Sequence, residues 1–166
     1  MFRLALLLSL FFFFEANAQV ESKAYDLMLS TLLSHSVPEI SVQQLSRMRD
    51  VVLLDAREEE EFTVSHIAAA KHVGYNEFDS KAFNAVAKDQ PIVVYCSVGY
   101  RSEKVAEKLK QAGFKQVFNL YGGIFEWVNQ GRVVVNAANQ PTENVHAFST
   151  AWGVWLNKGT KVYTAP

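Results

Sequence analysis

The apolar positions of the chain form short runs that alternate with stretches of helical periodicity. Continuous apolar runs at residues 51–54, 92–95 and 117–120 predict strands, and the second is apolar enough to be buried on both faces of a sheet. Residues 102–112 repeat apolar side chains at helical spacing, and Gly113 supplies a helix stop. This alternation predicts an α/β domain with a mainly parallel sheet and helices on both of its faces.

The other helices are predicted from spacing and from capping residues. Residues 23–35 predict an amphipathic helix that packs on the domain, and Ser41 with Gln44 resembles a capping box that opens a short helix through residue 48. The acids at residues 58–61 suit the first turn of a helix, and the first three fit a solvent-exposed face. Two further helices are predicted over residues 80–88 and 124–128.

The first eighteen residues have the pattern of a secretory signal peptide. Arg3 gives a positive start, residues 4–14 are almost wholly apolar, and Ala16 and Ala18 place small residues for cleavage after Ala18. The apolar run spans only about 16 Å of a ~30 Å hydrocarbon core, which argues against a membrane anchor. We therefore expect a periplasmic or secreted protein with no membrane association after cleavage.

Composition and charge narrow the classes of partner and cofactor. The 166 residues include 16 Lys and Arg and 17 Asp and Glu with no basic run, which argues against nucleic-acid binding. The single cysteine excludes an internal disulfide, a Cys-rich zinc site and an iron–sulfur cluster, and the four histidines are scattered and predict no metal site. In an oxidising compartment, an unpaired thiol is either shielded in the core or retained for its reactivity.

Cys96 lies where an α/β domain places its site, at the end of the central predicted strand and just before the helix that Ser102 begins. A short loop that contains Gly99 and enters a helix turns backbone N–H groups inward and forms an anion-binding nest. These amides, the helix N-terminus and the guanidinium of Arg101 favour the thiolate over the thiol. The alternative is an inert cysteine buried at a strand end.

Several motifs resemble the rhodanese family over about residues 38–132. Asp55-Ala56-Arg57, Glu61-Phe62, His66-Ile67 and Ala70 resemble the first family signature, the segment from Cys96 to Ser102 resembles the active-site loop, and Gly122-Gly123 with Trp127 resembles the closing element. Where the family has Gly-His-Ile-x-Gly-Ala, this chain has Ser65 and Ala69 in place of the two glycines.

The resemblance implies a single-domain rhodanese-like fold and sulfurtransferase chemistry through a persulfide on Cys96, without a metal or an organic cofactor. With the signal-peptide pattern of residues 1–18, we expect an exported member of this family. The implied partners are a small sulfur donor such as thiosulfate and a thiol or protein acceptor. Arg101 would hold the anionic donor unless its side chain points away, and Tyr100 and Trp127 would line the pocket mouth or only pack. The expected substrate-binding residues are Ser97, Val98, Gly99, Tyr100, Arg101 and Ser102, and Asp55, Arg57 and His66 are expected to support the structure.

Loop length favours sulfur chemistry over phosphorus chemistry. Phosphatases and arsenate reductases of related fold have five residues between cysteine and arginine, whereas four residues separate Cys96 from Arg101. The smaller cradle suits a terminal sulfur atom. A persulfide carrier or thiol-dependent binding module with little thiosulfate turnover remains an alternative, a phosphatase-like hydrolase is less favoured, and the presence of Cys96 disfavours a non-catalytic interaction domain.

The expected organisation of the chain follows from these assignments. It comprises a signal peptide (1–18), an N-terminal helical extension (19–37), a rhodanese domain (38–132) and a C-terminal extension (133–166) that packs on the domain through apolar and aromatic side chains.

Overall fold

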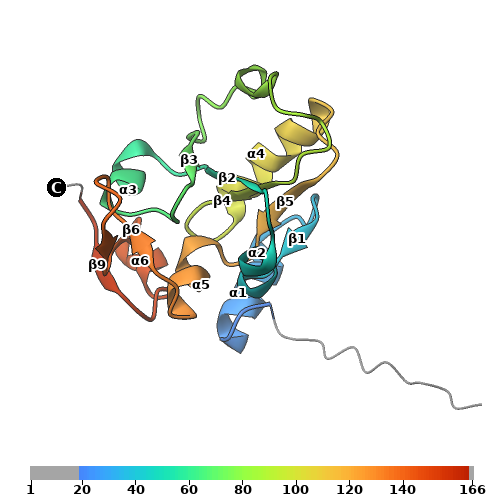
Figure 1. Cartoon of the computed structure of the whole chain (residues 1–166). Coiled ribbons are helices and arrows are strands. Elements are labelled where there is room, and N and C mark those ends of the chain that lie inside the picture. Colours follow the sequence, from blue (N-terminus) through green and yellow to red (C-terminus); the bar gives the residue numbers. More distant parts are fainter. Residues whose placement is uncertain (1–18, 165–166) are drawn as a thin grey trace, which may run out of the picture.

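A computed structural model describes residues 19–164 of the chain (Figure 1). The predicted signal peptide, residues 1–18, lies outside the described residues. The centre of the molecule is a five-stranded sheet with the order β1-β5-β4-β2-β3, in which every pairing is parallel. Its strands are β1 (Glu39–Ile40), β2 (Val52–Asp55), β3 (Lys71–His72), β4 (Ile92–Tyr95) and β5 (Val117–Leu120).

Helices cover both faces of the sheet, as the alternation of elements predicts. Alternate side chains of β4 enter two different apolar clusters: Val93 packs with residues of three helices on one face, and Val94 packs with residues of one long helix on the other. All four residues of β4 are buried, which explains its uninterrupted apolar sequence. The first face carries α1 (Lys23–Leu32), α2 (Val42–Arg47) and α5 (Gly123–Asn129), and the second carries α4 (Tyr100–Gln111).

The C-terminal residues form small elements beside α5 (Figure 1). Val145 and Leu156 are fully buried in the cluster that α1 and α5 share. The side chain of Asn129 on α5 donates to the Trp155 carbonyl at 2.9 Å and accepts from the Asn157 N–H at 2.7 Å. These elements are β6 (Val134–Val135), β7 (Pro141–Thr142), β8 (Asn144–His146), α6 (Thr150–Gly153) and β9 (Thr160–Val162), with β6 and β7 paired antiparallel and β8 and β9 paired parallel.

The residues before α1 are also packed onto the domain. Val20 is 1% exposed, and the N–H of Glu21 donates to the Glu126 carboxylate at 2.9 Å. Tyr25 stacks on Trp155 with ring centroids 5.4 Å apart, so the two flanking segments meet each other. Among residues 19–164, no helix combines the length and apolar character needed to cross a membrane.

Several predicted helix bounds differ from the observed ones. The helix expected to begin at Ser102 begins at Tyr100, so Tyr100 and Arg101 belong to α4. The predicted helix at 80–88 is wrong, because only a short 3₁₀ helix, η1 (Ser80–Phe83), forms there. Phe83, which ends η1, and Val86, three residues later, are the half-buried apolar side chains of this stretch, and its backbone bonds span three residues rather than four. The predicted helix at 23–35 ends at Leu32, since Leu33 and its successors leave the helical conformation. By contrast, the predicted bounds of β4 and β5 agree with the structure.

Candidate active site

Cys96 follows β4 at the carboxyl edge of the sheet and is 1% exposed. Gly99 precedes α4 with a φ of 124°, a conformation that side chains disfavour, and its N–H donates to the Cys96 Sγ at 3.1 Å. The first N–H groups of α4 have no acceptor within the helix and carry the positive end of its dipole. The thiol therefore lies beside a direct donor and a helix N-terminus.

Asn119 on β5 fixes the far side of this loop. Its amide donates to the Gly99 carbonyl at 3.0 Å and accepts from the Ser102 hydroxyl at 2.7 Å, and both polar side chains are fully buried. Sequence analysis did not include Asn119 in the site. The available signal was a polar residue inside the otherwise apolar run of 117–120.

The N-terminus of α5 holds the near side of the loop through the backbone. The N–H of Ile124 donates to the Cys96 carbonyl at 2.9 Å, and the N–H of Phe125 donates to the Ser97 carbonyl at 3.1 Å. A Cβ at Gly123 would lie 2.3 Å from the Cys96 carbonyl oxygen, so only glycine permits this approach. The Gly122-Gly123 motif thus positions the cysteine loop directly.

Arg101 lines the site, but Glu61 on α3 (Glu59–Val64) occupies its guanidinium. Two bonds join their side chains at 2.6 and 2.8 Å, and the Ser97 hydroxyl lies between them, 3.0 Å from Arg101 and 3.1 Å from Glu61. Burial alone would raise the pKa of Glu61, but the bonds and charge of Arg101 outweigh it and hold the pKa below its ordinary value. The charge of Arg101 is thus already balanced by Glu61, and binding of an anionic donor by this residue stays a prediction.

Asp55 and Arg57 form a fully buried ion pair beside β2. The Arg57 Nη2 lies 2.6 Å from the Asp55 carboxylate and 2.6 Å from the Ser65 carbonyl. Burial lowers the pKa of Arg57, but the charge and bonds of Asp55 outweigh that and raise it overall. His66 stacks on Phe62 with ring centroids 3.9 Å apart. None of Asp55, Arg57 and His66 lines the cavity described next.

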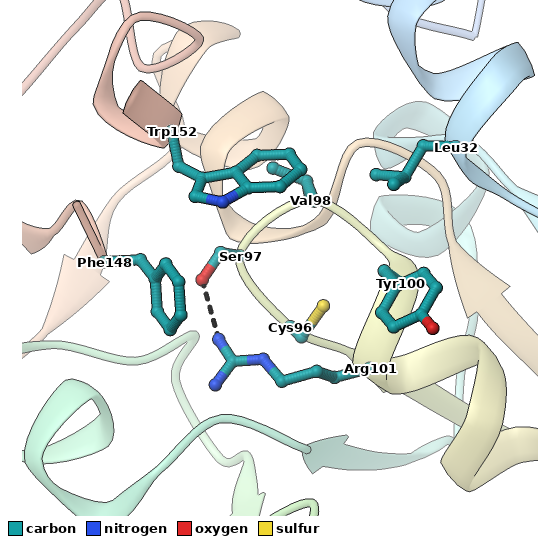
Figure 2. Close-up of a pocket in the computed structure, with 8 residues that line it drawn as sticks. All are labelled: Leu32, Cys96, Ser97, Val98, Tyr100, Arg101, Phe148 and Trp152. Carbon is teal, nitrogen blue, oxygen red and sulfur yellow. Dashed lines mark hydrogen bonds between the residues drawn. The ribbon is translucent and has the colours of Figure 1, made fainter. Parts of the chain in front are cut away.

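A cavity of about 330 Å³ opens above Cys96. Figure 2 shows the sulfur directed into the ring of side chains that encloses it. Tyr100 lines the cavity, whereas Trp127 does not and instead donates from its indole N–H to the Val133 carbonyl. The lining residues are Leu32, Cys96, Ser97, Val98, Tyr100, Arg101, Phe148 and Trp152.

Three walls of this cavity come from outside the motif-bearing segment. Leu32 ends α1, Phe148 precedes α6, and Trp152 lies within α6. The apolar tail predicts packing for Phe148 and Trp152, but nothing in its spacing indicates that they reach Cys96. Among residues 19–164, no group of three or more His, Cys, Asp or Glu residues is placed to hold a metal ion.

Known proteins resemble this chain in sequence and in fold. The sequence profile described as the Rhodanese-like domain matches residues 41–130, slightly more than half of the chain. The thiosulfate sulfurtransferase GlpE of Coxiella burnetii is 32% identical over 99 residues, covering 58% of this chain and 89% of the relative. YrkF of Bacillus subtilis, named as a candidate sulfur carrier protein, is 33% identical over 99 residues, covering 57% of this chain and 53% of the relative.

Solved structures give the same result. A rhodanese-related protein from Thermoplasma volcanium has a TM-score of 0.53 at 28% identity and covers 59% of this chain and 97% of its own. A protein from Bacillus halodurans has a TM-score of 0.55 at 25% identity, with 68% and 84% covered. With the matched profile, the parallel sheet and the cysteine loop in agreement, the chain belongs to the rhodanese-like domain family.

Proposed function

We propose that the protein is a sulfurtransferase that carries sulfane sulfur as a persulfide on Cys96. The observation that carries the proposal is the environment of the Cys96 Sγ, which accepts the Gly99 N–H and forms the floor of a cavity beside the N-terminus of α4. Amide donors in this arrangement stabilise negative charge on sulfur. GlpE, a relative named as a thiosulfate sulfurtransferase, supports the reaction type.

The reaction has two half-steps. The Cys96 thiolate attacks the outer sulfur of a donor such as thiosulfate, the sulfur–sulfur bond of the donor breaks, and sulfite leaves with the bonding electron pair. An acceptor nucleophile, such as cyanide in an assay or a thiol, then attacks the outer sulfur of the persulfide and releases the Cys96 thiolate. The residues of this chain supply the nucleophile and the N–H groups that stabilise it.

A persulfide carrier is the second candidate function. The observation that favours it is the pairing of Arg101 with Glu61. Among the described residues that line the cavity, every side-chain cation is thus already neutralised by a carboxylate. A dianion such as thiosulfate then has only backbone donors to bind. The carrier candidate predicts that the persulfide forms readily from a persulfide donor but that thiosulfate turnover is slow.

The test is the intact mass of the protein after incubation with thiosulfate. We expect a gain equal to one sulfur atom, located on Cys96 and removed by cyanide. Cys96→Ser should show no gain while keeping the fold, because a hydroxyl fits the same volume but cannot carry sulfane sulfur. A Cys96→Ser protein that retained thiocyanate formation, or a wild-type protein that gained no sulfur from either thiosulfate or an organic persulfide, would contradict the proposal.

A further inference from the structure

The cavity above Cys96 is lined by apolar side chains to an extent that a small anionic donor such as thiosulfate does not require. Leu32, Phe148 and Trp152 form its outer wall, and almost all of its exposed lining surface is apolar (Figure 2). Its volume of about 330 Å³ falls within the range of roughly 300–1,000 Å³ found for small organic ligands.

The charges around the cavity do not favour an anion. Arg101 is the one charged residue among the described lining residues, and it is paired with Glu61 through two short hydrogen bonds. The Ser97 hydroxyl is engaged by the same pair. An anionic group outside the nest would therefore lose its hydration without gaining an ionic partner, which costs free energy.

The apolar surface continues away from the thiol. A second hollow of about 600 Å³ runs along α1 and shares Leu32 and Trp152 with the cavity. Leu27 and Met28 line it, and Leu27 is 69% exposed. Thr31 and Trp152 are the only described lining residues of this hollow with a polar side-chain atom, and the Thr31 hydroxyl already donates to the Leu27 carbonyl. A polypeptide along this path would leave most of its backbone N–H and C=O groups without partners, whereas an alkyl or aryl chain has no such groups to satisfy.

We propose that the sulfur acceptor is a small organic thiol that carries an uncharged, apolar chain, and that Leu32, Phe148 and Trp152 select it. This inference rests on the proposed persulfide function of Cys96. The acceptor thiolate attacks the outer sulfur of the Cys96 persulfide, a new sulfur–sulfur bond forms, and the bond to Cys96 breaks. The Cys96 thiolate leaves with the electron pair, the acceptor becomes a hydrodisulfide anion, and the acceptor's thiol proton goes to solvent, so no oxidant or reductant is consumed.

The experiment measures how fast straight-chain thiols discharge the Cys96 persulfide. Ethanethiol, butanethiol and hexanethiol share the same reacting group and differ only in apolar length. We expect the second-order rate constant to rise about three- to fourfold with each added methylene, because each enters apolar surroundings. Mercaptopropionate, which carries a carboxylate, should react at least roughly tenfold more slowly than butanethiol.

Two variants test the residues that would provide this selectivity. Trp152→Ala should lower the hexanethiol-to-ethanethiol rate ratio by about tenfold. Phe148→Ala is the second variant, because Phe148 is 49% exposed and its truncation removes little packing. Val154→Ala is the matched control: Val154 lies two residues after Trp152, is 60% exposed, and lines neither hollow, so the ratio should stay at its wild-type value.

The outcomes separate this inference from the proposed function. A persulfide that cyanide discharges but whose reaction with thiols is independent of chain length would overturn the apolar acceptor and leave sulfur transfer standing. Faster discharge by a reduced dithiol protein than by hexanethiol would overturn it in favour of a protein acceptor. If no persulfide forms, binding of hexanethiol to Cys96→Ser, followed by tryptophan fluorescence, decides the matter: saturable binding that Trp152→Ala abolishes supports the apolar site, and no binding overturns it.

Discussion

Glu61 shows how a single carboxylate sets the electrostatics of the cysteine loop. It is 2% exposed, it binds Arg101 and the Ser97 hydroxyl, and it thereby joins α3 to the loop and to the first turn of α4. The sequence places Glu61 in a run of four acids, of which the other three are exposed. Its contact with Arg101, forty positions away, arises only when the sheet brings the two segments together.

The Glu61–Arg101 pair should make stability depend on pH in the acid range. The folded protein lowers the pKa of Glu61 below its ordinary value of about 4.5, so as pH falls the unfolded chain protonates Glu61 before the folded protein does. The pair therefore contributes its full stabilisation above pH 4.5, and this contribution is lost as pH falls through the pKa of Glu61 in the folded protein. Glu61→Gln should lose about 2 kcal/mol at pH 7 and show a smaller further loss toward acid pH. Urea unfolding of both proteins at a series of pH values measures this.

Arg101→Gln is the second variant whose unfolding free energy is measured across the same pH values. Without the guanidinium, burial dominates and raises the pKa of Glu61, so this carboxylate should oppose folding at neutral pH and do so less as it is protonated. Parallel pH profiles for all three proteins would show that the pair has no part in acid unfolding.

Ala69 adopts a left-handed backbone conformation, which favours glycine. Its φ is 64°, it is exposed, and it is the third residue of a turn closed by the Ala70 N–H and the Ile67 carbonyl. Ala69→Gly should raise the free energy of unfolding by about 0.5–1 kcal/mol, because it relieves left-handed strain without removing packing. Ser65→Gly is the control, since Ser65 is extended with φ −168° and should gain nothing. Thermal or urea unfolding of the two variants compares them; equal effects would contradict the strain argument.

At the scale of elements, the sequence predicts those helices and strands whose bounds are determined by local apolar runs and capping residues. The bounds of β4 and β5 follow from apolar runs, and the capping box at Ser41 starts α2 as expected. The helix predicted at 80–88 does not form: the backbone bonds of this stretch join residues three apart, and Phe83 and Val86, also three apart, are its half-buried apolar side chains. The position of the cysteine loop is predicted because the loop directly follows β4 in the sequence. The hydrogen bonds that hold the loop come from α5 and Asn119, and these contacts arise only in the folded protein.

The contact between α5 and the loop gives a prediction with an internal control. Gly123 and Gly113 have φ values of 57° and 91°, so alanine at either position adopts a strained conformation. At Gly113 an added Cβ meets nothing within 4 Å, whereas at Gly123 it meets the carbonyl oxygen of Cys96. Gly113→Ala should lose about 1 kcal/mol and keep its rate of persulfide formation.

Gly123→Ala should be less stable than Gly113→Ala and should form the persulfide about tenfold more slowly or worse, because the loop must shift to make room. Urea unfolding and timed intact mass measure both effects. Equal rates of persulfide formation in the two variants would mean that the position of α5 does not control the loop.

At the scale of the whole molecule, both flanking segments pack on the domain and on each other. Val20 is buried beside Gly122, and the stack of Tyr25 on Trp155 joins the N-terminal helix to the C-terminal segment. The helical spacing of apolar residues in the N-terminal flank and the apolar, aromatic composition of the C-terminal flank predict that both pack on the domain. Sequence analysis could not predict that they meet above Cys96, because no local pattern encodes a contact between two ends of a chain.

We propose that the protein is exported and that residues 1–18 are removed after Ala18. The support is the sequence pattern of this segment, with a positive start, an apolar run and small residues before the cleavage site. Expression in a Gram-negative host should give a periplasmic protein whose N-terminal sequence begins at Gln19, and Ala18→Phe should accumulate the longer form. A full-length protein retained in the cytoplasm would contradict this proposal.

The nucleophile and the outer wall of the cavity come from different parts of the sequence. Cys96 and its loop lie within residues 41–130, which the family profile matches, whereas Leu32 and Trp152 lie outside that range. Under the two proposals above, the nucleophile and the residues that select the acceptor are therefore encoded in different stretches of the sequence. Exchange of the flanks between relatives should therefore change which acceptor is preferred while Cys96 and its loop stay the same. Mutations in the flanks could likewise alter the acceptor preference without altering the nucleophile.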